Sequence, residues 1–229
     1  MATFKEDQRK NKELLFELFA RVGSALANPH RLEILDLLVQ SPRTVEELAS
    51  LAQMSVANTS QHLQRLKQAR LVVDERDGQH IYYCLADAAI ARLWIELRRV
   101  AERQLAEVER ALDQYRSHRS AFQRISVEDL LSGLNRDEIL LIDARPEVEF
   151  QAGHLPGAVS IPVQQLPARI DDLPDHKTLV AYCRGPYCVD ADEALIILAA
   201  HGYTVKRLEE GVAEWHEAGL SIERMKVEE

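Results

Sequence analysis

The pattern of apolar residues changes near residue 120, and this change constrains the fold of the 229-residue chain more than any other feature. Before it, apolar residues recur at spacings of three and four, which is typical of amphipathic helices. After it, short strand-like runs alternate with helical ones, which predicts a parallel α/β sheet. We therefore expect two domains, a mainly helical one over residues 1–119 and an α/β one over residues 120–229.

Composition and charge narrow the possible functions. Hydrophobic residues make up 46% and charged residues 28%, and the apolar runs are too short to cross a bilayer. Three cysteines are too few for a disulfide framework, so we expect a cytoplasmic protein with no membrane partner. Residues 1–120 carry 18 Lys and Arg against 17 Asp and Glu, whereas residues 121–229 carry 10 against 20. Only the first domain can approach DNA without strong repulsion.

The first domain is predicted to hold four helices, a β-hairpin and one long final helix. The hairpin is indicated by Asp77-Gly78 between two β-rich runs, and a Thr44–Glu47 capping box is expected to open the third helix. The apolar stripe of the final helix points to a partner helix. The expected elements are helices ending near Asn28-Pro29, Ser41-Pro42, Gln53-Met54 and Ala69, strands at 71–73 and 81–85, and a helix over 87–118.

Two short helices joined by a tight turn and followed by a hairpin form a winged helix-turn-helix, whose second helix enters the major groove of DNA. Asn and Gln side chains pair with adenine, and Arg pairs with guanine or phosphate. We expect Val56, Leu63 and Leu66 to face the core. The candidate DNA-contacting residues are Ser55, Asn58, Thr59, Gln61, His62 and Arg65 on the second helix and Arg76 and His80 at the hairpin tip.

Over about residues 10–118 the chain resembles the ArsR-type (ArsR/SmtB) family of winged-helix repressors. The matching motifs are LANPHRLEIL (26–35), VEELA (45–49), SQHLQRL (60–66), ARLV (69–72) and GQHIYYCL (78–85). The resemblance implies a homodimer, formed through the first and last helices, that leaves its operator when a signal binds.

The family's metal ligands are missing from this sequence. Residues 45–52 contain no cysteine, and the last helix offers only a lone His118 where zinc sensors carry several ligands. We therefore expect no metal and no cofactor, and Cys84 is interpreted as an inert thiol.

The chemistry of the second domain concentrates at Cys183. A buried strand is expected to end at this thiol, where open α/β sheets place their ligands, and a helix is expected from Val189. Backbone N–H groups at a helix N-terminus lower a thiol pKa and hold an anion. In the connecting loop, Gly185 is expected to supply backbone freedom and Arg184 a fixed positive charge.

Over about residues 122–224 the chain resembles the rhodanese (sulfurtransferase) domain. The motifs are LLIDARP (140–146), EF (149–150), GHLPGA (153–158), IP (161–162), YC (182–183) and a closing stretch from Leu208 to Trp215. The resemblance implies that Cys183 accepts a sulfane sulfur as a persulfide, and that Asp143 and Arg145 stabilise the fold near the loop. Many single-domain rhodaneses carry Arg where this chain has Cys188. Cys188 is either a second, attacking thiol or a small buried residue that opens the helix.

Three hypotheses follow for the function. The first is a homodimeric repressor that binds double-stranded operator DNA and responds to a sulfane-sulfur donor (thiosulfate, persulfide or polysulfide) at Cys183, with Arg184 and Cys188 beside it. The second is a sulfurtransferase that uses the first domain only to dimerise. The third is a sensor of arsenicals or other thiol-reactive ligands through Cys183 and Cys188.

Overall fold

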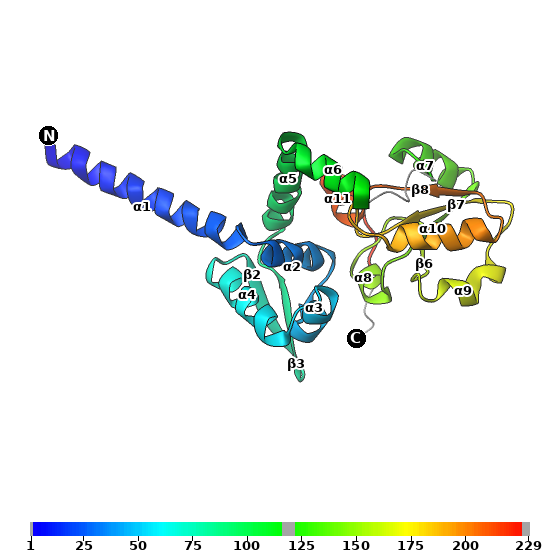
Figure 1. The fold of residues 1–229 in the computed structure, drawn as a ribbon, viewed down its shortest axis with the longest axis horizontal. Helices are drawn as coiled ribbons and strands as arrows, with labels where there is room; N and C mark the ends of the chain where they lie inside the picture. The colour runs from blue at the N-terminus through cyan, green and yellow to red at the C-terminus, as the bar shows by residue number, and fades with distance from the viewer. Residues whose placement is uncertain (1, 116–121, 226–229) are drawn as a thin grey trace. The chain divides into compact units, whose positions relative to one another are not determined.

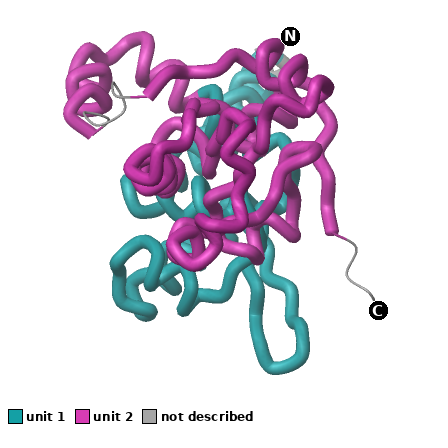
Figure 2. The backbone as a smooth tube through the Cα atoms, turned by 90° about the vertical axis from the view of Figure 1, so that its right-hand side faces the viewer, with its two compact units in different colours: residues 1–96 teal, residues 97–229 magenta. Residues whose placement is uncertain are grey.

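The computed structural model describes residues 2–115 and 122–225 (Figure 1). The chain divides into two compact units, Met1–Glu96 and Leu97–Glu229 (Figure 2). The border between the units lies inside helix α5, whereas the expected domain junction at residues 119/120 lies outside the described residues. In the described ranges, no helix combines the length and the apolar character that a bilayer crossing requires.

Unit 1 begins with four helices, three of which have starts set by capping residues. The Asn28 side chain accepts a hydrogen bond from the Arg31 N–H, and Ser55 caps the fourth helix in the same way. Thr44 and Glu47 form the predicted reciprocal capping box. The helices are α1 (Ala2–Leu26), α2 (Pro29–Gln40), α3 (Val45–Leu51) and α4 (Val56–Gln68).

The predicted hairpin is confirmed as β2 (Val72–Asp77) and β3 (His80–Leu85), which projects from unit 1 in Figure 2. Gly78 at its turn has a φ of 57°, a left-handed conformation that glycine adopts without strain. A two-residue strand, β1 (Arg43–Thr44), pairs with β3 and was not expected, because so short a run carries no pattern. The core of the unit contains the fully buried Ile34, Leu35, Leu48, Leu63 and Leu66.

The expectation of one helix over 87–118 is wrong. Helix α5 (Ala88–Gln104) is followed at Leu105 by a break and then by α6 (Ala106–Tyr115), and residues 116–118 lie outside the described part of the chain. Neither glycine nor proline occurs near the break. Glu102 of α5 and Tyr115 of α6, on either side of the break, both contact Tyr187. The helical pattern of the sequence did not indicate the position of the break.

Unit 2 is built on a five-stranded sheet in the order β4-β8-β7-β5-β6, and every pair in it is parallel. The central strand β7 is apolar because both of its faces are covered, and Leu179 to Tyr182 are fully buried. The strands are β4 (Gln123–Arg124), β5 (Ile139–Asp143), β6 (Ala158–Ser160), β7 (Thr178–Tyr182) and β8 (Val205–Arg207).

Two hydrophobic cores lie on the two faces of this sheet. One holds Leu130 and Trp215, and the other holds Leu166 and Leu198. The helices are α7 (Val127–Asn135), α8 (Glu147–Ala152), α9 (Leu166–Arg169) with a 3-10 turn (Ile170–Asp172), α10 (Asp190–Ala200) and α11 (Val212–Glu217). The predicted fold class is confirmed: a mainly helical winged helix-turn-helix is followed by a parallel-sheet α/β domain.

Candidate functional site

Cys183 lies directly after the central strand β7 and is 1% exposed. The loop after it leads into α10, and the Ala191 N–H in the first turn of that helix donates a hydrogen bond to the Cys183 sulfur. Gly185 in the loop has a φ of 121°, and a Cβ on it would lie 2.9 Å from Oε2 of Glu214. The backbone conformation therefore favours glycine at this position, and a larger residue would also displace the end of the Glu214 side chain.

Cys183 and Cys188 are in contact, and their environments separate their pKa values. Burial raises the pKa of Cys183, but a hydrogen bond from the Cys188 thiol, the charge of Arg207 and the Ala191 N–H outweigh it, so that the pKa is lowered. The hydrogen bond to Cys183 and burial raise the pKa of Cys188. The Cys183 thiol therefore loses its proton more readily than the Cys188 thiol does.

Arg184 is bound by two carboxylates. Its Nε and Nη2 donate to the buried Glu149 carboxylate at 2.9 and 2.7 Å, and its Nη1 lies 3.4 Å from Asp190. These carboxylates offset the fixed positive charge that the sequence predicts at this position, and the role of Arg184 at Cys183 stays a prediction.

Arg207 at the end of β8 also lowers the pKa of Cys183, although Asp192 and Glu209 lie beside its guanidinium. It is 1% exposed, its Nη1 lies 2.7 Å from Asp192, and its Nη2 donates to the Cys188 carbonyl at 3.4 Å. Sequence reasoning missed Arg207 because it lies 19 residues beyond Cys188. Only the pairing of β8 with β7 brings it to the loop.

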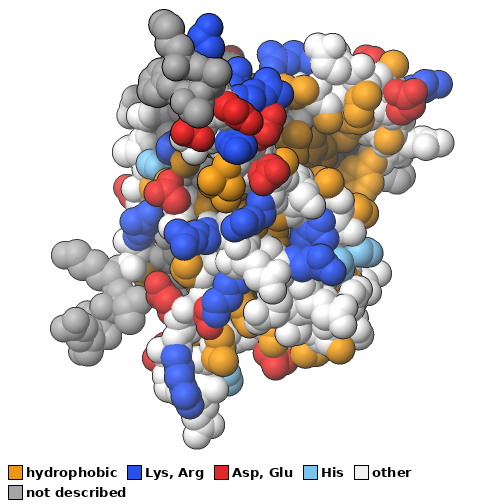
Figure 3. Space-filling view, turned by 90° about the vertical axis from the view of Figure 1, so that its left-hand side faces the viewer, with side chains coloured by type: hydrophobic (Ala, Val, Ile, Leu, Met, Phe, Trp, Pro, Cys, Tyr) orange, Lys and Arg blue, Asp and Glu red, His pale blue; other side chains and the backbone are white. Residues whose placement is uncertain are grey.

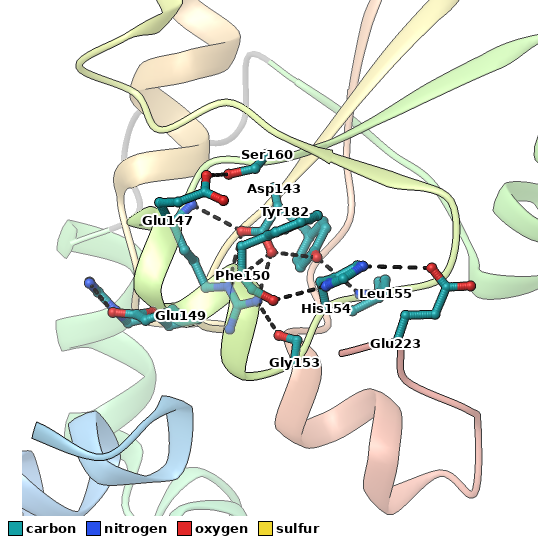
Figure 4. A network of polar contacts seen from close by, with 12 residues as sticks. Asp143, Glu147, Glu149, Phe150, Gly153, His154, Leu155, Ser160, Tyr182 and Glu223 are labelled. Carbon is teal, nitrogen blue, oxygen red and sulfur yellow. Dashed lines mark hydrogen bonds and ion pairs between the residues drawn. The ribbon is translucent and has the colours of Figure 1, made fainter. Parts of the chain in front are cut away.

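A buried network fixes the end of β7 just before Cys183. The Tyr182 hydroxyl donates to the Asp143 carboxylate at 2.5 Å and accepts from the Leu155 N–H at 3.1 Å (Figure 4). Arg145 lies 2.7 Å from the same carboxylate and donates to the Gly153 carbonyl at 2.7 Å. Asp143 and Arg145 are both fully buried, so neither charge is solvated by water and each is neutralised by the other.

His154 of the GHLPGA motif packs rather than reacts. Its ring stacks on Phe150 with centroids 3.7 Å apart, and its Nδ1 lies 2.8 Å from the Phe150 carbonyl oxygen (Figure 4). Across residues 2–115 and 122–225, no three His, Cys, Asp or Glu side chains gather as a metal site. Cys84 is half-buried, and burial together with Glu75 and Asp74 raises its pKa.

In unit 1, the recognition helix α4 differs from the sequence prediction at two positions. Thr59 is fully buried, and its hydroxyl donates to the Ser55 carbonyl at 3.1 Å, so the expectation that it points outward is wrong. Val56 is 45% exposed and does not face the core, whereas Leu63 and Leu66 do. Gln61 and Arg65 are exposed, and Asn58 and His62 are half-exposed.

Positive charge gathers beside α4. A cavity of about 390 Å³ is lined by Arg21, Arg31 and Arg65, and none of the described residues that line it carries a carboxylate. The His62 ring lies 5.5 Å from that of His30, and burial together with the charges of His30, Arg31 and Arg65 lowers the His62 pKa. Such a cavity favours phosphate oxygens.

The hairpin tip offers two further exposed side chains. Arg76 donates to the Gly78 carbonyl at 3.2 Å, and the His80 ring lies 6.3 Å from that of Tyr82. On the face drawn in Figure 3, Lys and Arg side chains are interspersed with exposed hydrophobic side chains.

Comparison with known proteins matches a different family to each part of the chain. Residues 28–73 match the family described as bacterial regulatory protein, arsR family, and residues 126–218 match the rhodanese-like domain. The sequence is 42% identical over 217 residues to the HTH-type transcriptional regulator Rv0324 of Mycobacterium tuberculosis, covering 94% of this chain and 95% of that one. It is 31% identical over 87 residues to a sulfurtransferase of Allochromatium vinosum, covering 38% of this chain and 79% of that one.

A solved structure is similar to the first unit. The homodimeric winged helix-turn-helix DNA-binding domain (fragment 1–100) of Mb0332 from Mycobacterium bovis is 43% identical, with a TM-score of 0.40, covering 42% of this chain and 89% of that chain. The long match to Rv0324 and the two domain matches lead to one conclusion. The chain belongs to the ArsR-family HTH-type DNA-binding transcriptional regulators that carry a C-terminal rhodanese-like domain.

Proposed function

We propose that this regulator is a homodimeric repressor whose operator binding is controlled by sulfane sulfur at Cys183. The observation that carries the proposal is the thiol pair: Cys183, with its lowered pKa, contacts Cys188 in the same chain that carries a DNA-binding helix. A sulfane-sulfur donor such as thiosulfate, a persulfide or a polysulfide is the signal.

The dimer is supported by the apolar surface of α1. Several leucine and phenylalanine side chains on this helix are 42–65% exposed, and a second copy of the chain would cover them. They are Leu14, Leu15, Phe16, Leu18 and Phe19. A two-fold axis would place two α4 helices about one helical turn of DNA apart, so the operator is an imperfect palindrome. The residues that contact DNA are Ser55, Asn58, Gln61, His62 and Arg65 of α4 with Arg76 and His80 of the hairpin.

The sulfur step is a thiol exchange. The Cys183 thiolate attacks the sulfane sulfur of a donor RS–SH; an S–S bond forms at Cys183, the RS–S bond breaks, and the leaving thiolate takes a proton from water. In a second step the Cys188 sulfur, after losing its proton to solvent, attacks Sγ of Cys183 and releases hydrogen sulfide. The two cysteines lose two electrons, which the sulfane sulfur gains, and a Cys183–Cys188 disulfide remains.

A mobility-shift titration of operator DNA, with the protein reduced or treated with polysulfide, tests the proposal. We expect wild type to lose about 5–150-fold in operator affinity, the range of ordinary allosteric coupling. Cys183→Ser should bind the operator and ignore polysulfide. Cys188→Ser should still respond only if the persulfide alone is the signal. If wild type and Cys183→Ser release the operator identically, Cys183 is not the sensor.

The similarity to the Allochromatium vinosum sulfurtransferase favours a second candidate, in which the rhodanese-like domain turns over. Transfer of sulfur from thiosulfate to cyanide, measured as thiocyanate, distinguishes the two. Efficient turnover with no effect of any donor on operator affinity would favour an enzyme. A single loading of Cys183 without turnover would favour a sensor.

A further inference from the structure

The loop between the two cysteines is contacted by the helices that precede the rhodanese-like domain. The Tyr187 hydroxyl donates a hydrogen bond to the Glu102 carboxylate of α5. The Arg98 guanidinium of α5 lies over the Tyr187 ring, 5.1 Å from its centroid. The Tyr115 hydroxyl of α6 donates to the Tyr187 carbonyl at 2.8 Å. Tyr187, which is next to Cys188, is therefore held by both helices.

A second group of contacts joins α5 to α11, behind the same loop. Arg98 pairs with Glu214, and Arg99 lies 2.9 Å from Glu217. The Arg98 and Glu214 side chains are only 8% and 13% exposed, so water screens their attraction little. Glu214 also accepts from the Gly211 N–H at 3.1 Å and lies against Gly185. The carboxylate that anchors α5 thus also limits the position of the loop.

The start of α5 belongs to unit 1. The Trp94 indole N–H donates to Asp36 of α2 at 2.7 Å, and Ile90 and Ile95 are buried. Ile95 and Arg98 are less than one helical turn apart. A shift of Arg98 within unit 2 therefore acts on the same helix as Ile90, which lies in the core of unit 1, and Trp94, which donates to Asp36.

We infer that Tyr187 transmits the state of the Cys183–Cys188 pair to helix α5, an inference that rests on the proposed function. An added sulfur atom on a 1%-exposed Cys183 has no vacant solvent position to occupy, so the loop must move. A cavity of about 360 Å³, lined in part by Pro186, Glu214 and Trp215, gives the loop room to do so. Because Pro186 precedes Tyr187, this movement changes the contacts with Glu102 and Arg98.

The test compares Tyr187→Phe, which removes one hydroxyl, and Glu102→Ala, which removes the acceptor of that hydroxyl, with a matched control. Tyr203→Phe is the control because it too removes one hydroxyl that donates a hydrogen bond within unit 2, in this case to the Ile170 carbonyl at 2.8 Å, away from the cysteine loop. Three quantities are measured in the full-length protein: operator affinity, Cys183 persulfidation by mass spectrometry after polysulfide, and amide hydrogen exchange of residues 97–104.

We expect Tyr187→Phe and Glu102→Ala to take up sulfur at Cys183 and to bind the operator within about 3-fold of wild type when reduced. Their loss of affinity on polysulfide treatment should shrink to under about 2-fold, while wild type and Tyr203→Phe keep the full response of about 5–150-fold. Persulfidation should change hydrogen exchange in α5 of wild type but not of Tyr187→Phe.

The outcomes separate the inference from the proposed function. If the two variants respond like wild type, in operator affinity and in α5 exchange, the Tyr187 link is refuted while sulfur control stands. If wild-type α5 exchange responds to persulfidation and operator affinity does not, the proposed function fails and the link stands. If α5 exchange in wild type is unaffected, the link is refuted whatever the operator does.

Discussion

Replacing Asp143 with alanine removes the carboxylate that accepts hydrogen bonds from both Arg145 and Tyr182. Arg145 and Asp143 are both 0% exposed, so the variant leaves a guanidinium buried without its counter-charge. Removing one partner of a buried ion pair costs about 3–5 kcal/mol of the free energy of unfolding. The Tyr182 hydroxyl, also fully buried, would lose its acceptor at a further cost of about 1–3 kcal/mol, of which part overlaps with the first.

Urea denaturation of the full chain, followed by tryptophan fluorescence, measures this loss, because Trp215 lies in a core of unit 2. We expect these two contributions to lower the free energy of unfolding of unit 2 in Asp143→Ala by about 3–6 kcal/mol. The double variant Asp143→Leu/Arg145→Met removes both charges and should recover most of that loss, since apolar replacements of a buried pair are often neutral or better. A single-variant loss below about 1 kcal/mol would refute the reasoning that these charges are buried and mutually dependent.

Three further predictions concern DNA contact, thiol reactivity and helix capping. Gln61→Ala should relax operator preference at about 1–3 kcal/mol per lost base contact, measured by fluorescence anisotropy on operator and scrambled DNA, while the buried Thr59→Val should leave base preference unchanged. As the pH is lowered, Cys183 should still react with a small electrophile at pH values where Cys84 no longer does, because the pKa of Cys183 is lowered and that of Cys84 is raised. Mass spectrometry of each thiol measures the two reaction rates. A Cys84 that still reacts at a pH where Cys183 does not would contradict this expectation. Thr44→Ala should cost about 0.5–2 kcal/mol of the free energy of unfolding of unit 1, measured by thermal denaturation, because it removes the capping box of α3.

The sequence predicted those features that depend on neighbours in the chain. The Thr44–Glu47 capping box, the turn at Gly78 and the position of Cys183 after β7 each depend on residues a few positions apart. The alternation of strands and helices also predicted a parallel sheet, because such strands need crossover connections.

The errors occurred where tertiary contacts decide. Thr59 occupies a polar position of the helical pattern, yet its hydroxyl is satisfied by the Ser55 carbonyl and the side chain packs inside. Arg184 lies beside Cys183 in sequence, but Glu149, 35 residues away, binds it. Arg207 reaches the loop only through the order of strands in the sheet. None of these partners could be identified from spacing along the chain.

Helix α5 contains residues of both units, so contacts within unit 1 and contacts within unit 2 follow one another along a single helix. Trp94 meets Asp36 of unit 1, and Arg98 meets Glu214 of unit 2, four residues further along the same helix. Each residue added to an α-helix rotates all later residues of that helix by about 100°. One residue inserted between Trp94 and Arg98 would therefore turn the contacts after it by about 100° about the helix axis relative to those before it, whereas seven inserted residues would change that direction by only about 20°. Regulators descended from a fusion of this kind should vary the length of this segment by whole pairs of helical turns.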